Sequence, residues 1–419
     1  MAISKIQYTV TDGNLFKAIA GEDHVSAILF DVTTTPDGGG TIPTDGEVHQ
    51  IFSIDQAEAL GIDGIIDPKS PTGSEYEGGV VYKHIQDFFT VNPNGELWIG
   101  LADCSSDFSH LTNIQNVAQG RVRQIGVYTE QEVFVDGAPY TLNGYISAIN
   151  TIAEADAENN IPYSVVISGN TATVSNGGTD VDITQIPTAI SNLKRVSLTL
   201  GQSNDALTKA IQDNDTTKAT VGIVGSVIGA ISLAAVHESI GWTGKFNLSA
   251  SIPTIAFGFG GVIADIDNNT PYESLDINQL NTFDNNGYIF PLRYPDLAGT
   301  YFSSNQTLTS GDYRTIARNR AIDKSRRNVR LALLPTIQQP LYVNPENGNV
   351  SVGTIGQFTS IVDTQLSALT SLAEISGYSI NINPKQDVLA NDGISIQYRI
   401  IPVGENKNID VEIGFSRTV

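Results

Sequence analysis

One acidic string in this 419-residue sequence has the oxygen spacing of a metal-binding loop. Asp265, Asp267, Asn269 and Asp276 occupy positions 1, 3, 5 and 12 of a possible EF-hand calcium loop. Thr270 stands at position 6, where that loop requires glycine, and position 12 lacks the usual bidentate glutamate. A solvated acidic loop is the simpler interpretation, and calcium binding is the alternative. We therefore expect no metal site.

A second group of side chains is strongly basic. Seven of the 23 lysines and arginines fall within residues 314–330, where only Asp323 opposes them. They are Arg314, Arg318, Arg320, Lys324, Arg326, Arg327 and Arg330. One interpretation is a helix that pairs with the acidic surface of its own subunit. The other is a docking helix for an acidic partner protein. Nucleic acid is a third and weaker interpretation, because the net charge of −22 would repel phosphates.

The motifs of common catalytic chemistries are missing from the sequence. It contains no Walker loop, no HExxH pair and no Gly-x-Ser-x-Gly elbow. The five histidines show no ligand spacing, and a single cysteine, Cys104, excludes a disulfide framework and cysteine-rich metal sites. We expect neither catalytic residues nor a cofactor. The first residues also lack the layout of a secretory signal, which favours folding in a cytoplasm.

The elements that must position these groups alternate along the chain. Five apolar runs have the length of buried strands: 25–32, 96–103, 122–129, 163–169 and 195–201. Helical patterns at 141–158 and 183–192 stand between some of them, and another at 203–214 follows the last. This order predicts an α/β (α+β) fold with a mixed sheet and flanking helices. Two more helices are expected at 312–334, which holds the basic cluster, and at 354–375.

The longest uncharged stretch lies at residues 218–244. Ala219 to Val236 is long enough for a membrane helix to be considered. Gly222, Gly225 and Gly229 interrupt it, no second span accompanies it, and no basic flank follows it. The glycines make a flat face that lets another backbone approach closely. A buried central helix, with no membrane insertion, is therefore the preferred interpretation.

Both ends of the chain carry strands with alternating apolar faces. Residues 5–12 place Ile6, Tyr8 and Val10 on one face. A terminal hairpin is expected from 394–403 and 409–417, joined by a turn at 404–408, and its second arm aligns Ile409, Val411, Ile413 and Phe415. Such strands pair within their own subunit or add to sheets of neighbouring copies. Head-to-tail addition without closure builds a helical polymer.

The last 220 residues resemble a known family, the contractile tail-sheath proteins of phages and contractile injection systems, in a divergent branch. Several segments in order carry the resemblance: Val236-His-Glu-Ser-Ile-Gly-Trp242, Asn286-Gly-Tyr-Ile289, Tyr294-Pro-Asp-Leu-Ala-Gly-Thr-Tyr-Phe302, Arg320-Ala-Ile-Asp-Lys324 and Arg327-Asn-Val-Arg330. A long helix after Gly353 and the terminal hairpin complete the pattern. The series at 96–201 resembles the family's α/β part more loosely.

The resemblance implies a structural role in a virion tail or injection particle, assembled in a bacterial host cytoplasm. Subunits of that family stack as hexameric rings into a helical sleeve around an inner tail tube. A baseplate triggers contraction, which drives the tube through a target envelope, and a tail terminator caps the assembly. The woven terminal strands of the family correspond here to residues 5–12 and 394–417, and the tube contact corresponds to Arg314–Arg330.

The resemblance also implies a division of the chain. We expect an N-terminal arm and linker at 1–24, an N-terminal α/β part without an assigned place at 25–95, and an α/β domain at 96–217. A sheath core domain follows at 218–392 and a C-terminal hairpin or arm at 393–419. The alternative function is a soluble ligand-binding protein or enzyme whose site lies at strand carboxyl ends near 100–130 and 168–175.

Overall fold

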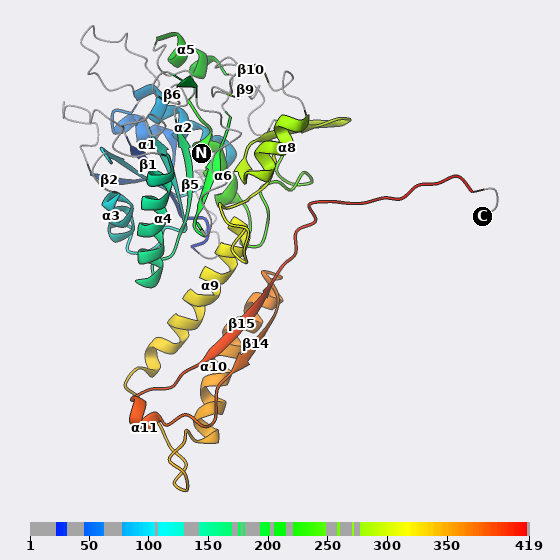
Figure 1. The fold of residues 1–419 in the computed structure, drawn as a ribbon. Helices are drawn as coiled ribbons and strands as arrows, with labels where there is room; N and C mark the ends of the chain where they lie inside the picture. Colours follow the sequence, from blue (N-terminus) through cyan, green and yellow to red (C-terminus); the bar gives the residue numbers. More distant parts are fainter. Residues whose placement is uncertain are drawn as a thin grey trace, which may run out of the picture.

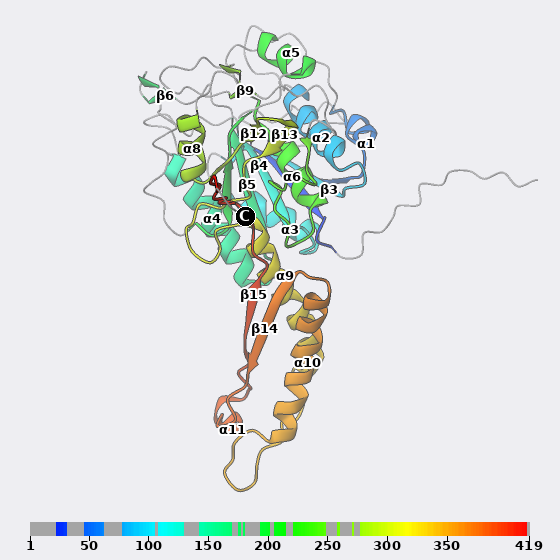
Figure 2. The same cartoon turned by 90° about the vertical axis from the view of Figure 1, so that its right-hand side faces the viewer.

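The computed structural model describes residues 22–31, 46–62, 78–104, 108–129, 142–169, 175–176, 179–180, 193–201, 205–214, 221–248, 258–259, 270–271 and 277–416. Figures 1 and 2 show three parts. A body is built on a central sheet, an elongated lobe (residues 316–402) projects from it, and an extended arm leaves the end of the lobe that lies next to the body.

The body is organised around a seven-stranded sheet. Its order is β11-β8-β5-β4-β1-β3-β2, and every neighbouring pair is parallel except β2 with β3. The strands are β1 (Ser26–Asp31), β2 (Val48–Ile51), β3 (Leu97–Ala102), β4 (Gln124–Thr129), β5 (Ser164–Gly169), β8 (Val196–Thr199) and β11 (Tyr288–Ile289). The antiparallel edge strand makes the sheet mixed, so the predicted α/β class is confirmed.

Helices cover both faces of this sheet, which explains why its strands read as continuous apolar runs. Along β1, Ile28 and Phe30 join the core on one face, and Ala27 and Leu29 join the core on the other. Helices α2 (Gly78–Val91) and α6 (Val224–Leu233) cover the first face, and α3 (Ser109–Val117) and α4 (Leu142–Glu158) cover the second. Helices α1 (Ile54–Ala59) and α5 (Ala206–Asn214) lie beside α2.

Helix α6 is the buried helix that the glycine-rich stretch predicted, although it is only ten residues long. All of its residues up to Ser232 are buried. A Cβ added at Gly225 would lie 2.1 Å from the carbonyl oxygen of His84 in α2, so the two backbones touch there. None of the helices among the described residues is both long enough and apolar enough to span a membrane.

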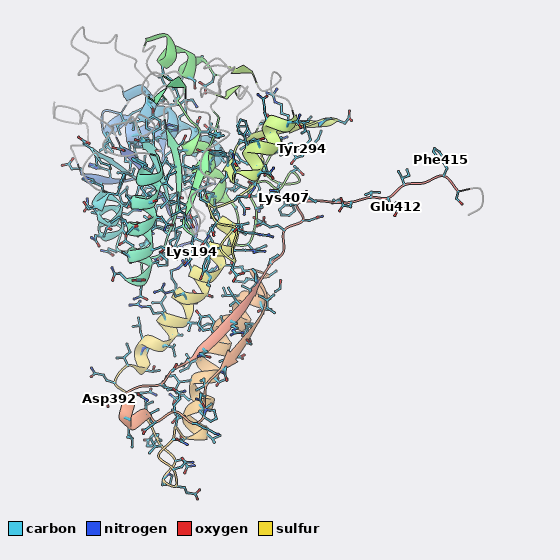
Figure 3. The ribbon with its side chains drawn as sticks, viewed as in Figure 1. Lys194, Tyr294, Asp392, Lys407, Glu412 and Phe415 are labelled. Atoms are coloured by element: carbon cyan, nitrogen blue, oxygen red, sulfur yellow. The ribbon has the colours of Figure 1, made fainter. Side chains whose placement is uncertain are left out.

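Smaller elements surround the end of the sheet at β11. Helix α8 (Ile277–Asn285) precedes β11, and the hairpin β12 (Pro291–Tyr294) and β13 (Leu297–Phe302) follows it. Figure 3 shows Tyr294 at the tip of this hairpin, where it projects from the body. The short pairs β6 (Ser175–Asn176) with β7 (Thr179–Asp180), and β9 (Gly258–Phe259) with β10 (Thr270–Pro271), complete the body.

The lobe has its own small core. It comprises α9 (Ile316–Leu333), the 3-10 turn η3 (Leu334–Thr336), α10 (Val352–Ser371), β14 (Ile375–Asn381), α11 (Val388–Asn391) and β15 (Gln397–Pro402). Thr315 and Ser351 cap the two long helices through their side chains. Val362, Leu366 and Leu369 form the buried stripe of α10. Both helices predicted for this region are therefore present.

The predicted terminal hairpin is wrong. Strand β15 pairs antiparallel with β14, not with residues 409–417, and residues 403–416 form neither helix nor strand. The predicted extended C-terminal arm is present in place of the hairpin's second strand (Figure 1).

Two of the expected domain boundaries lie inside the body. Strand β1 stands between β3 and β4, so residues 25–95 share a sheet with 96–217. Helix α6 packs on that same sheet, and β11 extends it beside β8. The described residues within 221–302 therefore belong mainly to the body, because most of their buried apolar side chains join its two cores, while Val236 joins the core of the lobe. The division that the structure shows falls instead near the start of α9.

Candidate functional site

The C-terminal arm, residues 403–416, is the most exposed apolar segment among the described residues. Ile409, Val411, Ile413 and Phe415 are 74%, 79%, 92% and 110% exposed. Figure 3 shows the arm running away from the molecule, with Glu412 and Phe415 near its end. Four large apolar side chains at alternate positions of an extended segment make one face of a strand without a partner.

The base of the arm is fixed to the body. Glu405 accepts a hydrogen bond from Asn305 at 3.1 Å, and Lys407 lies 2.8 Å from a carboxylate oxygen of Asp284 in α8. These contacts hold residues 404–408 extended, although their composition predicted a turn. The arm therefore leads away from β15 and does not fold back on it, which is the physical reason why the expected hairpin is absent.

The basic cluster on α9 is largely engaged within its own subunit. Arg320 is buried and donates to the carbonyl oxygens of Ala234 and Ala235, just beyond the end of α6, and to that of Asp23. This places a cation at the negative end of a helix dipole. Arg326 approaches the carbonyl oxygen of Glu158 at 3.4 Å.

Asp23, three residues before the start of β1, is the centre of an ionic junction. Its carboxylate lies 2.7 Å from both Lys324 and Arg327 of α9. Lys324 also forms an ion pair with Glu374, which directly precedes β14. The junction therefore links the segment before β1 to α9 and to the start of β14. Burial raises the pKa of Asp23, but the hydrogen bond and charge of Lys324 and the charges of Arg327 and Arg320 outweigh it and lower the pKa overall.

Three members of the cluster remain available for a partner. Arg314 and Arg330 are exposed and Arg318 is half-buried, and no hydrogen bond or ion pair joins their guanidinium groups to the described residues. Asp323, the one acid in the cluster, pairs with buried Arg195 of the body at 2.8 and 3.1 Å. Sequence reasoning did not identify Arg195, Asp23 or Glu374 as partners, because each lies far from its partner along the chain.

Two predicted groups lie outside the described residues. These are the calcium candidate of Asp265, Asp267, Asn269 and Asp276, and the N-terminal strand with Ile6, Tyr8 and Val10. Within the described part of the chain, no three histidine, cysteine or acidic side chains gather as a metal site would require.

At the carboxyl end of β1, in the region where the alternative function would place a site, a buried carboxylate is held by hydrogen bonds. Asp31 at the end of β1 is fully buried. It accepts hydrogen bonds from the hydroxyls of Thr129 and Tyr145 and from the backbone N–H of Cys104, at 2.8 to 2.9 Å. These contacts give the carboxylate a structural role, linking β1, β3, β4 and α4.

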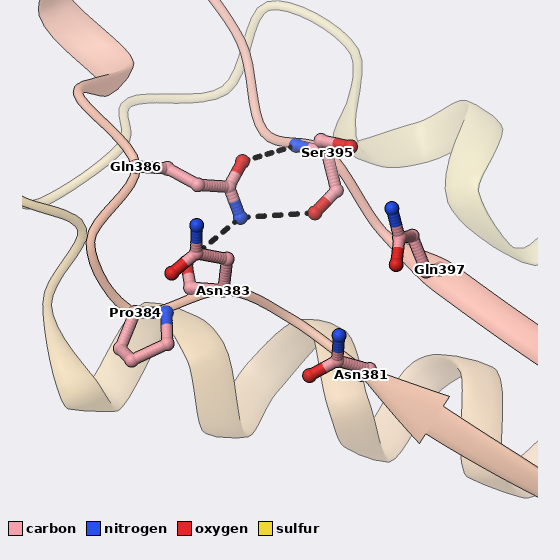
Figure 4. Close-up of a pocket in the computed structure, with 6 residues that line it drawn as sticks. All are labelled: Asn381, Asn383, Pro384, Gln386, Ser395 and Gln397. Atoms are coloured by element: carbon pink, nitrogen blue, oxygen red, sulfur yellow. Dashed lines mark hydrogen bonds between the residues drawn. The ribbon is translucent and has the colours of Figure 1, made fainter.

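A polar hollow of about 380 Å³ lies on the lobe, where β14 and β15 separate. Figure 4 shows its lining, which is rich in carboxamides: Asn381, Asn383, Pro384, Gln386, Ser395 and Gln397. Gln386 donates to the carbonyl oxygens of Asn383 and Ser395 and accepts from the Ser395 N–H at 2.6 Å. The bonds of Gln386 close the loop between the two strands, so this side chain is structural.

Comparisons with known proteins place this architecture in a class. Solved structures similar to the chain include the anti-feeding prophage baseplate (TM-score 0.59, 14% identity, 99% of this chain and 100% of that chain). The sheath complex of an extracellular contractile injection system, PVC, in its contracted state has a TM-score of 0.57 at 11% identity, covering 100% of this chain and 99% of that chain. A sheath tail protein from Listeria innocua has a TM-score of 0.51 at 9% identity, covering 91% of this chain and 92% of that chain. The fold is that of contractile tail-sheath proteins, as the resemblance predicted.

Within that fold class the chain belongs to the DUF2586 family. The model of the DUF2586 N-terminal domain matches residues 4–306, and that of the C-terminal domain matches residues 312–419. No curated protein sequence matches the chain. The junction of the two family domains coincides with the passage from the body to α9.

Proposed function

We propose that this chain is the structural subunit of a contractile sheath, and that its role is assembly and movement, not catalysis. The observation that carries the proposal is the C-terminal arm, which presents four exposed apolar side chains on a fold shared with sheath proteins over nearly the whole chain. An arm whose base is fixed to the body and whose end carries exposed apolar side chains is suited to bind a neighbouring copy. A head-to-tail contact of this kind propagates without closing.

Several finer features of the proposal follow the resemblance. Copies stack as hexameric rings into a helical sleeve around an inner tail tube, between a baseplate and a tail terminator, in a virion tail or injection particle assembled in the host cytoplasm. Residues 5–12 add a second strand contact between copies through Ile6, Tyr8 and Val10. The tube contact rests on Arg314, Arg318 and Arg330, since the other four cations of α9 already have partners in the subunit.

Electron microscopy of the purified protein at rising concentration tests the proposal. We expect rings, sleeves or tubular polymers, and their amount should increase with protein concentration because assembly is intermolecular. A protein that stays monomeric at high concentration, and whose melting temperature rises with a small ligand, would contradict the sheath and support the alternative of a ligand-binding protein or enzyme.

A further inference from the structure

A buried lysine in α2 lies between two carboxylates. The side chain of Lys83 is only 1% exposed, and its Nζ pairs with Asp87, one turn further along the same helix, and with Asp205, which directly precedes α5. Nζ lies 3.0 Å from Oδ2 of Asp205. The two carboxylates are themselves 4% and 16% exposed. One base and two acids are therefore held together in a place where water solvates their charges poorly.

The surroundings of this triad are apolar. Val80, Val81 and Ile85 of α2 and Ile211 of α5 belong to the core on this face of the sheet. Helix α5 lies beside α2 at the edge of the body (Figures 1 and 2). In such surroundings an ammonium and a carboxylate lose much of their hydration, so a proton transfer that makes both groups neutral costs less than it does in water. A neutral lysine amine is a nucleophile.

The charges of the triad decide which groups exchange the proton. Burial lowers the pKa of Lys83, but the charges of Asp87 and Asp205 outweigh burial and raise the pKa overall. The lysine is therefore charged at rest, and its amine becomes neutral only by giving a proton to a carboxylate within the triad. Burial raises the pKa of Asp87 more than the charge of Lys83 lowers it. Asp87 is thus suited to take up and release protons there.

The carboxylate of Asp205 is oriented by α5. Its Oδ1 accepts a hydrogen bond from the backbone N–H of Thr208 at 2.8 Å, and its Oδ2 faces Lys83. The carboxyl carbon is one covalent bond from the oxygen that Nζ already contacts. An amide at this carbon would keep Oδ1 as its carbonyl oxygen, so the hydrogen bond to Thr208 would survive. Oδ2 is the oxygen that would leave.

We propose that Lys83 and Asp205 condense to an isopeptide bond that ties α2 to α5. The bond between Nζ and Cγ forms, and the bond between Cγ and Oδ2 breaks. Two protons of the ammonium leave with Oδ2 as one water, the third stays on the amide nitrogen, and the opposite charges of the two groups disappear together. Asp87 relays the protons from Nζ to Oδ2 and ends as it began. The contact of the reacting groups supplies the proximity that the condensation needs.

This inference goes beyond the sheath function and concerns the single subunit. Mass spectrometry of the purified and denatured protein tests it. We expect a mass below that of the sequence by one water, about 18 Da, and a protease digest should contain a linked peptide pair that carries Lys83 and Asp205. Lys83→Arg keeps the positive charge but lacks the amine, so it is the matched control and should show no loss of water.

Two further variants test the roles of the acids. Asp205→Asn keeps the cap on Thr208 and still has a group that can leave, so we expect the same linked peptides with loss of ammonia, about 17 Da, in place of water. Asp87→Asn preserves the size of the side chain but removes the proton relay. It should leave most chains unlinked, while circular dichroism and a cooperative melting transition show that the chain is folded.

The outcomes separate the bond from the sheath function. Folded native protein whose mass shows no loss of water overturns the inference and leaves the triad an ion pair. A link from Lys83 to Asp87 overturns the assignment to Asp205, and linkage that is as complete in Asp87→Asn as in the native chain overturns the relay. Polymer formation is measured separately by electron microscopy, so a missing bond leaves the sheath function standing, and missing polymers leave the bond standing.

Discussion

Gly225 is the residue at which the central packing of the body is tightest. Its missing side chain lets the backbone of α6 approach the carbonyl of His84, and an added Cβ would lie only 2.1 Å from that oxygen. The obstacle is backbone within a helix, which a rotamer change cannot move aside. Glycine is therefore required at position 225 because the backbones of α2 and α6 approach closely there, and not because of a positive φ angle.

Replacing Gly225 with alanine should destabilise the protein by about 3 kcal/mol, at the upper end of the usual cost of overpacking. Urea or thermal unfolding of the purified chain measures this. Gly356 in α10 is the matched control, since a Cβ there would meet nothing within 4 Å. Gly356→Ala should stabilise the chain by about 0.5–1 kcal/mol through helix propensity. Equal effects of the two substitutions would show that the α2–α6 contact does not set the cost.

Helix α9 illustrates what sequence reasoning resolves at the scale of an element and what it does not. Its length, its Thr315 cap and its cationic character follow from local residues. Local residues do not show whether each cation has a partner within the subunit. Asp23, the partner of Arg327, lies about 300 positions away in the sequence, where no local pattern can reveal it. The same limit explains the failed hairpin prediction. The composition of residues 404–408 suits a turn, but Asn305 and Asp284 hold them extended from distant parts of the chain.

Charge reversal on α9 should separate folding from tube binding. Arg327→Glu places an acid against Asp23 in the ionic junction, so we expect lower stability by about 3 kcal/mol, as for breaking a largely buried pair. Arg330→Glu, three residues further on at an exposed position, should leave the melting temperature unchanged and weaken co-sedimentation with the tube protein. Tube binding that survives reversal of Arg314, Arg318 and Arg330 together would remove α9 from the contact.

At the scale of the whole molecule, the sequence was sufficient for the alternating sheet and helices, the buried glycine-rich helix and the apolar row of the C-terminal arm, which the structure shows exposed. It was insufficient for the boundary between body and lobe. Strand β1 enters the middle of the sheet between β3 and β4, and that order depends on which apolar faces can be covered together. No single segment of the chain carries that information, so the expected boundaries followed composition and not the core.

Deleting residues 409–419 should abolish long polymers and leave the fold intact. The described part of the deleted segment, 409–416, contributes nothing to the buried cores, and the anchoring contacts of Glu405 and Lys407 remain. Electron microscopy measures polymer length, and thermal unfolding should show a melting temperature within about 1 °C of the full chain, since exposed segments contribute little to stability. Asp410→Asn is the control that keeps the apolar row. Polymers of unchanged length from the truncated chain would exclude the arm from assembly.

The bonds at the start of α9 have a mechanical consequence. Arg195 donates two hydrogen bonds to Asp323, and Arg320 donates to the chain just after α6, so we expect the lobe and the body to move as one rigid unit. Each copy then has only the three translations and three rotations of a solid object. In an assembly that shortens, the change of length must be expressed entirely in those six coordinates and in the bending of the arms. The way in which the particle shortens would thus depend on where the arms bind neighbouring copies, and not on a change of shape within the subunit.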